Sequence, residues 1–230
     1  NKLLKKAFDD LPIDLKNAMK IASSRIKSFH EKQKLSGFEY EDELGVNLGL
    51  KYSPIKRVGL YTPGGKALYP SSVLMNALPA LVAGVEERVL VSPINLEKSS
   101  EILLAAAYLA EVTEFYRMGG AHAIAALAFG TKDLKKVDKI VGPGNAYVAE
   151  AKRQLFGKVG IDSVAGPSEV LIVADNKNNP EWIAIDLLSQ AEHDENAQSI
   201  LITNDEKFAK NVENQICLLY TSDAADDCEG

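Results

Sequence analysis

Hydrophobic residues follow two different patterns along the chain. Over residues 2–35 they recur at spacings near three and four, which is the period of an α-helix that buries one face. The next stretch, residues 36–56, is rich in glycine and favours turns with one short extended segment. From residue 57 onward, short apolar runs alternate with helical patterns. The chain is therefore expected to begin with a helical segment and to continue as an α/β region.

Short runs rich in Val, Ile, Leu or Tyr are the predicted strands of this region. They are Arg57–Tyr61, Arg88–Ser92, Glu114–Arg117, Lys139–Val141, Glu169–Ala174 and Ser199–Thr203. The predicted helices between them cover residues 71–84, 97–110, 121–129, 145–156 and 180–194. Strands that alternate with helices in this way form mostly parallel sheets covered by helices on both faces. We therefore predict the α/β class.

Three predicted strands end in turns rich in glycine, at Tyr61–Gly65, Met118–Ala121 and Gly142–Asn145. In open α/β sheets, ligands bind outside the carboxyl ends of the strands, where helix N-termini favour anions. A Gly-x-Gly-x-x-Gly motif is missing from the sequence, so a standard dinucleotide site is not predicted. The three turns together leave a structural and a ligand-binding interpretation equally open.

Composition restricts the class of protein and of partner. With 46% hydrophobic and 25% charged residues, the 230-residue chain has the composition of a globular protein. Its net charge of −6 opposes binding to nucleic acid or to an anionic membrane. The longest apolar stretches, such as Leu103–Ala110, are far shorter than the roughly 20 residues of a membrane-spanning helix. The first residues lack Met and a secretory signal, which fits processing or a chain cut at its front.

Both cysteines, Cys217 and Cys228, lie in the last fourteen residues. A disulfide framework, a thiolate zinc site and a cysteine nucleophile are therefore excluded before residue 217, which suits a reducing cytoplasm. Residues 217–230 resemble the in-frame translation of a transposon-end adapter used to prepare DNA libraries, the alternative being a natural acidic tail. On the first interpretation, the gene continues beyond Ile216.

Three histidines are present, and His193 has the most suggestive neighbours. It ends a predicted helix in which Gln190, three residues earlier, lies on the same face. An imidazole nitrogen and an amide oxygen at this spacing can share one zinc ion. Two ligands do not make a site, however, and a hydrogen-bonded histidine at a polar helix end is the interpretation that spacing alone favours. His30 lies on a charged helix face, and His122 begins a predicted helix beside a glycine turn.

Ser168 stands at the entrance of a predicted strand, directly after the tight turn expected at Gly166-Pro167. A histidine base that would make it a nucleophile is not evident, so a hydrogen-bonding role is the better functional hypothesis. A structural turn serine is the alternative.

Several long motifs, in order, resemble those of the histidinol dehydrogenase family. They are Val58–Gly65, Gly119–Ala121, Lys136–Asn145, Ile161–Glu169 and Asp186–His193. The resemblance covers about residues 10–216, whereas members of that family are nearly twice as long as this chain. It implies two NAD-dependent oxidations of L-histidinol to L-histidine through the aldehyde, with a zinc ion that holds the substrate.

The resemblance also implies roles for individual residues. Gln190 and His193 would be zinc ligands that also face the substrate, and Ser168 would be a substrate contact. The residues that would contact NAD are Tyr61, His122 and Asn145. His122 stands where the family pattern has Gln, which keeps a hydrogen-bonding group and changes its shape.

The family performs its proton transfers with a Glu-His pair, which would lie beyond the end of this sequence together with the remaining zinc ligands. The resemblance thus implies an inactive fragment of a cytoplasmic homodimer. It also implies two incomplete Rossmann-like units. Residues 58–166 would form an inserted unit with the NAD contacts, and residues 1–57 and 167–216 would belong to the other unit.

Two other functions compete with this one. An aldehyde dehydrogenase-type enzyme requires a nucleophilic cysteine, which residues 1–216 lack. A non-catalytic nucleotide- or phosphate-binding α/β module would use the three glycine turns and would be indifferent to zinc.

Overall fold

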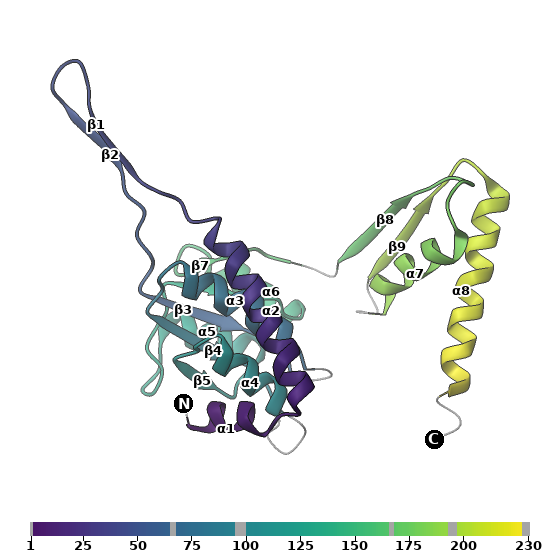
Figure 1. Ribbon diagram of the computed structural model, residues 1–230, viewed down its shortest axis with the longest axis horizontal. Coiled ribbons are helices and arrows are strands. Elements are labelled where there is room, and N and C mark those ends of the chain that lie inside the picture. The colour runs from purple at the N-terminus through teal and green to yellow at the C-terminus, as the bar shows by residue number, and fades with distance from the viewer. Residues whose placement is uncertain (1, 65–67, 95–99, 166–167, 193–196, 227–230) are drawn as a thin grey trace. The chain divides into compact units, whose positions relative to one another are not determined.

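The computed structural model describes residues 2–64, 68–94, 100–165, 168–192 and 197–226 (Figure 1). The chain divides into two compact units, residues 1–165 (the first unit) and residues 166–230 (the second unit). The predicted division of the chain has a boundary at residue 166. The predicted grouping of residues 1–57 with 167–216 stays a prediction.

The N-terminal segment forms two helices, α1 (Lys2–Asp10) and α2 (Ile13–Glu31). The sequence pattern shows one periodic stretch here, but Pro12 precedes α2 with φ −55° and ψ 145°. Proline lacks an N–H group and keeps the preceding residue out of the helical conformation, so the helix is interrupted there. Both helices pack on other helices of the first unit, α1 on α4 and α2 on α3.

A β-hairpin follows, formed by the antiparallel strands β1 (Phe38–Glu41) and β2 (Asn47–Leu50). The sequence predicts one extended segment in this stretch, and the structure has two. Every residue of both strands is exposed, which is why no burial pattern marks them in the sequence. The carboxylate of Asp42 organises the turn by accepting hydrogen bonds from the backbone N–H groups of Leu44 and Val46, both at 2.9 Å.

The centre of the first unit is a parallel sheet with the strand order β5-β4-β3-β6-β7. The strands are β3 (Arg57–Tyr61), β4 (Glu87–Val91), β5 (Glu114–Tyr116), β6 (Lys139–Val141) and β7 (Gly160–Ile161). The helices are α3 (Pro70–Val82), α4 (Glu101–Leu109), α5 (Gly120–Phe129) and α6 (Ala146–Leu155). The predicted α/β class is confirmed. Strand β7 was not predicted because two residues are too few to show a pattern.

The two faces of this sheet bury separate hydrophobic clusters. Leu60 and Leu90 lie in the cluster that contains the inner faces of α1 to α4. Tyr61 and Val91, their neighbours in sequence, lie in the cluster formed with α5 and α6. Successive residues of a strand point to opposite faces, so a sheet covered on both sides buries all of them. Every residue of β3 is accordingly buried.

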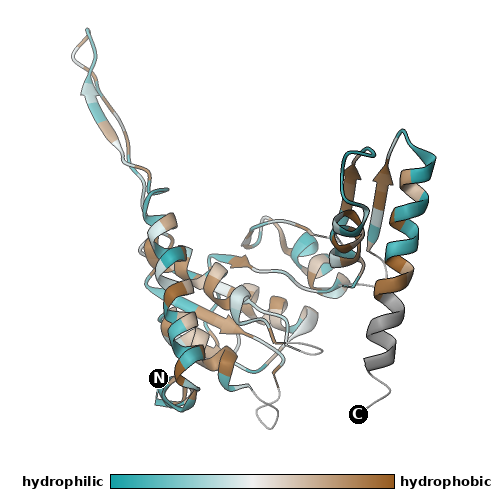
Figure 2. Ribbon diagram, turned by 45° about the vertical axis from the view of Figure 1, so that its right-hand side comes forward, coloured by the Kyte–Doolittle hydropathy of each residue, from teal (hydrophilic) through white to brown (hydrophobic). Residues whose placement is uncertain are grey.

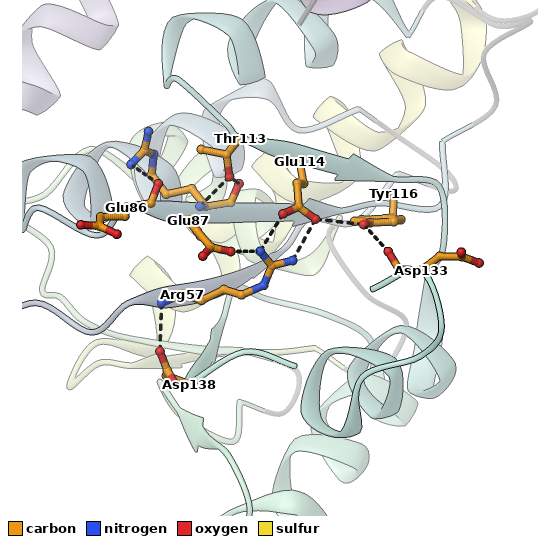
Figure 3. A network of polar contacts seen from close by, with 9 residues as sticks. Arg57, Glu86, Glu87, Thr113, Glu114, Tyr116, Asp133 and Asp138 are labelled. Atoms are coloured by element: carbon orange, nitrogen blue, oxygen red, sulfur yellow. Dashed lines mark hydrogen bonds and ion pairs between the residues drawn. The ribbon is translucent and has the colours of Figure 1, made fainter. Parts of the chain in front are cut away.

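A charged network joins the first strands at the amino end of the sheet (Figure 3). The guanidinium of Arg57 binds both carboxylate oxygens of Glu114, at 2.6 and 2.8 Å, and also contacts Glu87. Tyr116 adds a hydrogen bond of 2.9 Å to Glu114, and the backbone N–H of Arg57 donates to Asp138 at 2.9 Å. The starts of β3, β4 and β5 are therefore tied to one buried cation.

The second unit consists of the parallel strands β8 (Glu169–Val173) and β9 (Gln198–Ile202) with helices α7 (Pro180–Ala191) and α8 (Glu206–Asp226). Asn179 caps α7 by accepting a hydrogen bond from Glu181 N at 2.9 Å, with Pro180 in the first turn as predicted. The helices cover one face of the two strands through a core that includes Ala184, Leu187 and Phe208. The strands themselves are strongly hydrophobic (Figure 2).

Helix α8 was not predicted: its first part, residues 206–216, was assigned no element, and residues from 217 onward were left out of the predicted fold. The helix continues to Asp226, and Ile216 and Leu219 pack against the core of the second unit. The origin of residues 217–230 stays a hypothesis. Within the described part of the chain, none of the helices combines the length and the hydrophobicity needed to cross a membrane.

Candidate functional site: the carboxyl edge of the parallel sheet

The strand order of the first unit reverses between β3 and β6. From β3 the chain moves outward through β4 to β5, and then returns to the other side of β3 as β6. Ligands of open α/β sheets bind at the carboxyl ends of the strands beside such a reversal. The turns that follow β3 and β6 are two of the glycine-rich turns of the sequence, which makes this edge the candidate site.

The turn after β6 lies directly against the end of β3. Gly142 has φ +116°, in a region that side chains rarely adopt, and a Cβ at this residue would lie 2.0 Å from the carbonyl oxygen of Tyr61. Glycine is therefore required at residue 142. Asn145 follows three residues later, as the N-cap of α6.

Tyr61 connects the end of β3 to the glycine turn Met118–Ala121. Its side chain is 3% exposed, and its hydroxyl accepts a hydrogen bond of 3.0 Å from the backbone N–H of Gly120, the first residue of α5. His122 lies in the first turn of α5 and is exposed. The structure thus holds Tyr61 against the beginning of the helix that carries His122.

Asn145 begins α6. Its side-chain oxygen accepts a hydrogen bond of 3.1 Å from Val148 N, which is typical of an N-cap. The residue is exposed, and the capping bond engages its oxygen while the NH2 group remains as a donor for a ligand. The three residues proposed as NAD contacts from the sequence therefore lie at the carboxyl edge of one sheet.

Two buried hydroxyl groups at this edge have no hydrogen-bond partner within the part of the chain that the structure describes. Thr62 and Ser92 directly follow β3 and β4, and each residue is 0% exposed. Among the described residues, neither Thr62 Oγ1 nor Ser92 Oγ has a hydrogen-bond partner. Buried polar groups nearly always have partners, so such orphans commonly occur at sites for water, ions or ligands. The N-termini of α5 and α6 at the carboxyl edge favour an anionic group such as phosphate.

A pocket of about 200 Å³ lies behind the turn after β6, lined by residues that include Gly142, Gly144, Lys152 and Asp162. Lys152 on α6 is 4% exposed and forms an ion pair with Asp162, which follows β7. Partial burial alone would raise the pKa of Asp162. Hydrogen bonds from Lys152, Gly142 N and Ser163 N outweigh that effect and hold the pKa below its usual range.

The other predicted site residues belong to the second unit. Ser168 is exposed and stands immediately before β8, as predicted. Gln190 is half-buried in the last turn of α7. His193 lies outside the described residues. Amide oxygen and imidazole nitrogen are suitable donors for zinc. Over the described ranges, no group of three or more His, Cys, Asp or Glu side chains is placed to hold a metal ion.

Comparison with known proteins identifies the family. A family model described as histidinol dehydrogenase matches residues 1–226. The chain belongs to the histidinol dehydrogenase family.

Individual members of the histidinol dehydrogenase family are closely similar to the chain. Histidinol dehydrogenase 1 of Trichormus variabilis is 61% identical over 199 residues, which cover 86% of this chain and 46% of that protein. Histidinol dehydrogenase of Brucella melitensis is 60% identical over 210 residues, which cover 91% of this chain and 49% of that protein. The crystal structure of histidinol dehydrogenase from Elizabethkingia anophelis matches with a TM-score of 0.87 and 39% identity, covering 96% of this chain and 52% of that one. The chain spans about half the length of these histidinol dehydrogenases.

Some residues at the carboxyl edge were not found from the sequence. The motif that indicated the histidinol dehydrogenase family includes Asp162, but its partner Lys152 is a lysine on a helix, which normally indicates a solvated surface. The signal that was available is its position on the same face of α6 as the buried Val148. Nothing in the sequence marks the hydroxyl groups of Thr62 and Ser92 as buried and unsatisfied.

Proposed function

We propose that the chain takes part in the NAD-dependent oxidation of L-histidinol to L-histidine through the aldehyde. The observation that carries this proposal is the placement of Tyr61, His122 and Asn145 at one carboxyl edge, in a chain of the histidinol dehydrogenase family. When bound there, NAD would accept the hydride that leaves the carbinol carbon. The residues of this edge would bind and orient it.

Tyr61 and Asn145 are suited to this role in different ways. The hydroxyl of Tyr61 accepts a hydrogen bond from Gly120 N, so its proton remains available for donation to the cofactor. Asn145 has its oxygen engaged in the helix cap, which orients its NH2 group. His122 is exposed and would contact the cofactor from the start of α5.

The substrate would bind through residues of the second unit. Gln190 and His193 would hold a zinc ion, and Ser168 would donate a hydrogen bond to the substrate. Bound zinc would fix the amine and the imidazole of histidinol and thereby orient the carbinol for oxidation. The Glu-His pair of the family would have to remove the hydroxyl proton and activate water for the second oxidation.

The isolated 230-residue polypeptide spans about half the length of its relatives, and we expect it to turn over no histidinol by itself. In the complete protein we expect a cytoplasmic homodimer. Neither nucleic acid nor membrane is proposed as a partner, which agrees with the net charge of −6.

A chimaera tests the proposed function directly. Residues 1–216 would be joined to the part of the Brucella melitensis relative that extends beyond the matched region, and NADH formation with L-histidinol would be measured. We expect turnover, which His193→Ala should abolish together with zinc binding. His30→Ala is the matched control, since His30 contacts only Gln33 among the hydrogen-bond partners described for it. A folded chimaera that binds zinc and forms no NADH would contradict the proposal.

The competing nucleotide-binding module predicts a different outcome. Zinc affinity would then be unaffected by His193→Ala, while NAD binding by the 230-residue chain would persist. Zinc titration of the His193→Ala and His30→Ala variants by calorimetry separates the dehydrogenase from the nucleotide-binding module.

A further inference from the structure

Lys152 presents a charge where helices normally bury apolar groups. Its side chain is 5% exposed, and an ammonium group withdrawn from water in this way must be paired. Its Nζ donates a hydrogen bond of 3.1 Å to the carbonyl oxygen of Gly142 and forms an ion pair with Asp162. The buried cation of α6 is therefore engaged with the turn after β6 and with a carboxylate that follows β7.

Asp162 contacts the same turn from the other side. Its Oδ2 accepts a hydrogen bond of 2.8 Å from Gly142 N, and its Oδ1 accepts one of 2.7 Å from Ser163 N. The N–H and the C=O of Gly142 are thus both bound by one ion pair. Two opposed contacts on a single residue fix the orientation of both its peptide groups.

Gly142 needs this support because of its own conformation. Its φ is +116° and its backbone contacts that of Tyr61. Such a conformation persists only where the surrounding structure holds it in place. Three residues later Asn145 caps α6. A rotation of the peptide groups at Gly142 would displace Asn145 relative to the end of β3.

We propose that Lys152 and Asp162 are positioning residues that fix the turn Gly142–Asn145 and thereby hold Asn145 in the orientation that binds the dinucleotide. The inference rests on the proposed function, since it assumes that Asn145 contacts NAD. Asp162 also binds Ser163 N, so the same pair fixes the start of the segment that leads along the chain to Ser168.

The test compares Lys152→Met and Asp162→Asn with a matched control in the 230-residue chain. Arg153→Met removes the neighbouring charge on α6, whose ion pair with Glu150 is exposed. The affinity for NAD would be measured by titration calorimetry, and folding by circular dichroism. We expect Lys152→Met and Asp162→Asn to weaken NAD binding about fivefold or more, which corresponds to about 1 kcal/mol, and Arg153→Met to leave it within about twofold.

Two further measurements separate positioning from simple stabilisation. Lys152→Arg keeps the charge and the donors, so it should recover part of the affinity that Lys152→Met loses. Amide hydrogen exchange at Gly142 should become faster in Lys152→Met and Asp162→Asn, while exchange in β3 stays unchanged. A folded Lys152→Met variant with unaltered NAD affinity would overturn the proposal.

Failure of the proposed function gives a distinct result. If the unsubstituted chain binds no NAD, the assignment of the cofactor site is wrong. The positioning role is then decided by hydrogen exchange alone. Faster exchange at Gly142 in both variants supports control of the turn, and unchanged exchange refutes it.

Discussion

Replacement of Arg57 by Met tests the network at the amino end of the sheet. The substitution keeps the unbranched apolar part of the side chain and removes the guanidinium, which leaves Glu87 and Glu114 without their shared cation. Breaking a fully buried ion pair costs about 3–5 kcal/mol. The Glu87 and Glu114 side chains are 29% and 35% exposed, so water solvates them partly after the change. We therefore expect the free energy of unfolding of the first unit to fall by about 2–3 kcal/mol.

The assay is urea unfolding followed by two signals. Far-UV circular dichroism reports on both units, whereas Trp182, the single tryptophan of the sequence, lies in α7 and reports on the second unit. Arg57→Met should lower the midpoint of the circular dichroism transition that belongs to the first unit, and the fluorescence transition is the internal control. A double-mutant cycle with Glu114→Gln should give a coupling energy of about 1–3 kcal/mol.

Acid provides a second measurement of the same pair. The hydrogen bond from Arg57 is the largest cause that lowers the pKa of Glu114, against the opposing effect of burial. Because the pKa is lower in the folded state, this stabilisation is present above the unfolded pKa of about 4.3 and is lost as the pH falls through the folded pKa. Arg57→Met should reduce this acid dependence. A stability change below about 1 kcal/mol, with an unaltered acid dependence, would refute the reasoning.

Three smaller changes give further predictions. A non-glycine residue with positive φ costs about 1–2 kcal/mol. Gly142→Ala should destabilise the first unit by more than this, because its Cβ would also meet the carbonyl oxygen of Tyr61. Gly157→Ala, with φ +90° and open space around the new Cβ, is the control in urea unfolding. His122→Gln introduces the residue that the family resemblance implies at this exposed position. Calorimetry should show tighter NAD binding, and thermal unfolding should show no change. Weaker binding would count against the proposed contact. Asp162, with its lowered pKa, contributes stability that is lost as the pH falls through that pKa. Asp162→Asn should abolish this part of the acid dependence of the first unit, which unfolding at several pH values would measure.

The sequence predicted the parts of the fold in which local pattern and burial coincide. Strands β3 and β4 were found because burial on both faces of the sheet selects runs of mostly apolar residues. The hairpin of β1 and β2 has no buried face, so its apolar residues formed no interpretable pattern. The break at Pro12 was overlooked because the apolar period continues on both sides of it.

The candidate site likewise contains residues that the sequence predicted and contacts that it could not predict. Tyr61 and Asn145 were predicted as NAD contacts from the family resemblance; Tyr61 ends β3, and Asn145 caps the helix that follows the neighbouring strand β6. The contact of Lys152 with Asp162 depends on how a helix and a strand end approach each other, which periodicity does not reveal. The orphan hydroxyl groups of Thr62 and Ser92 are likewise a property of the packed state.

The network around Arg57 has a consequence for how such a protein can diversify. Its central contacts join Arg57, Glu87 and Glu114, which are the first residues of β3, β4 and β5, at the end of the sheet opposite the glycine-rich turns. Insertions or substitutions in the turns of that opposite edge therefore leave the strand alignment intact. The sheet of the first unit is a scaffold on which those turns can be exchanged, by evolution or by loop grafting, without a change in the register of the strands.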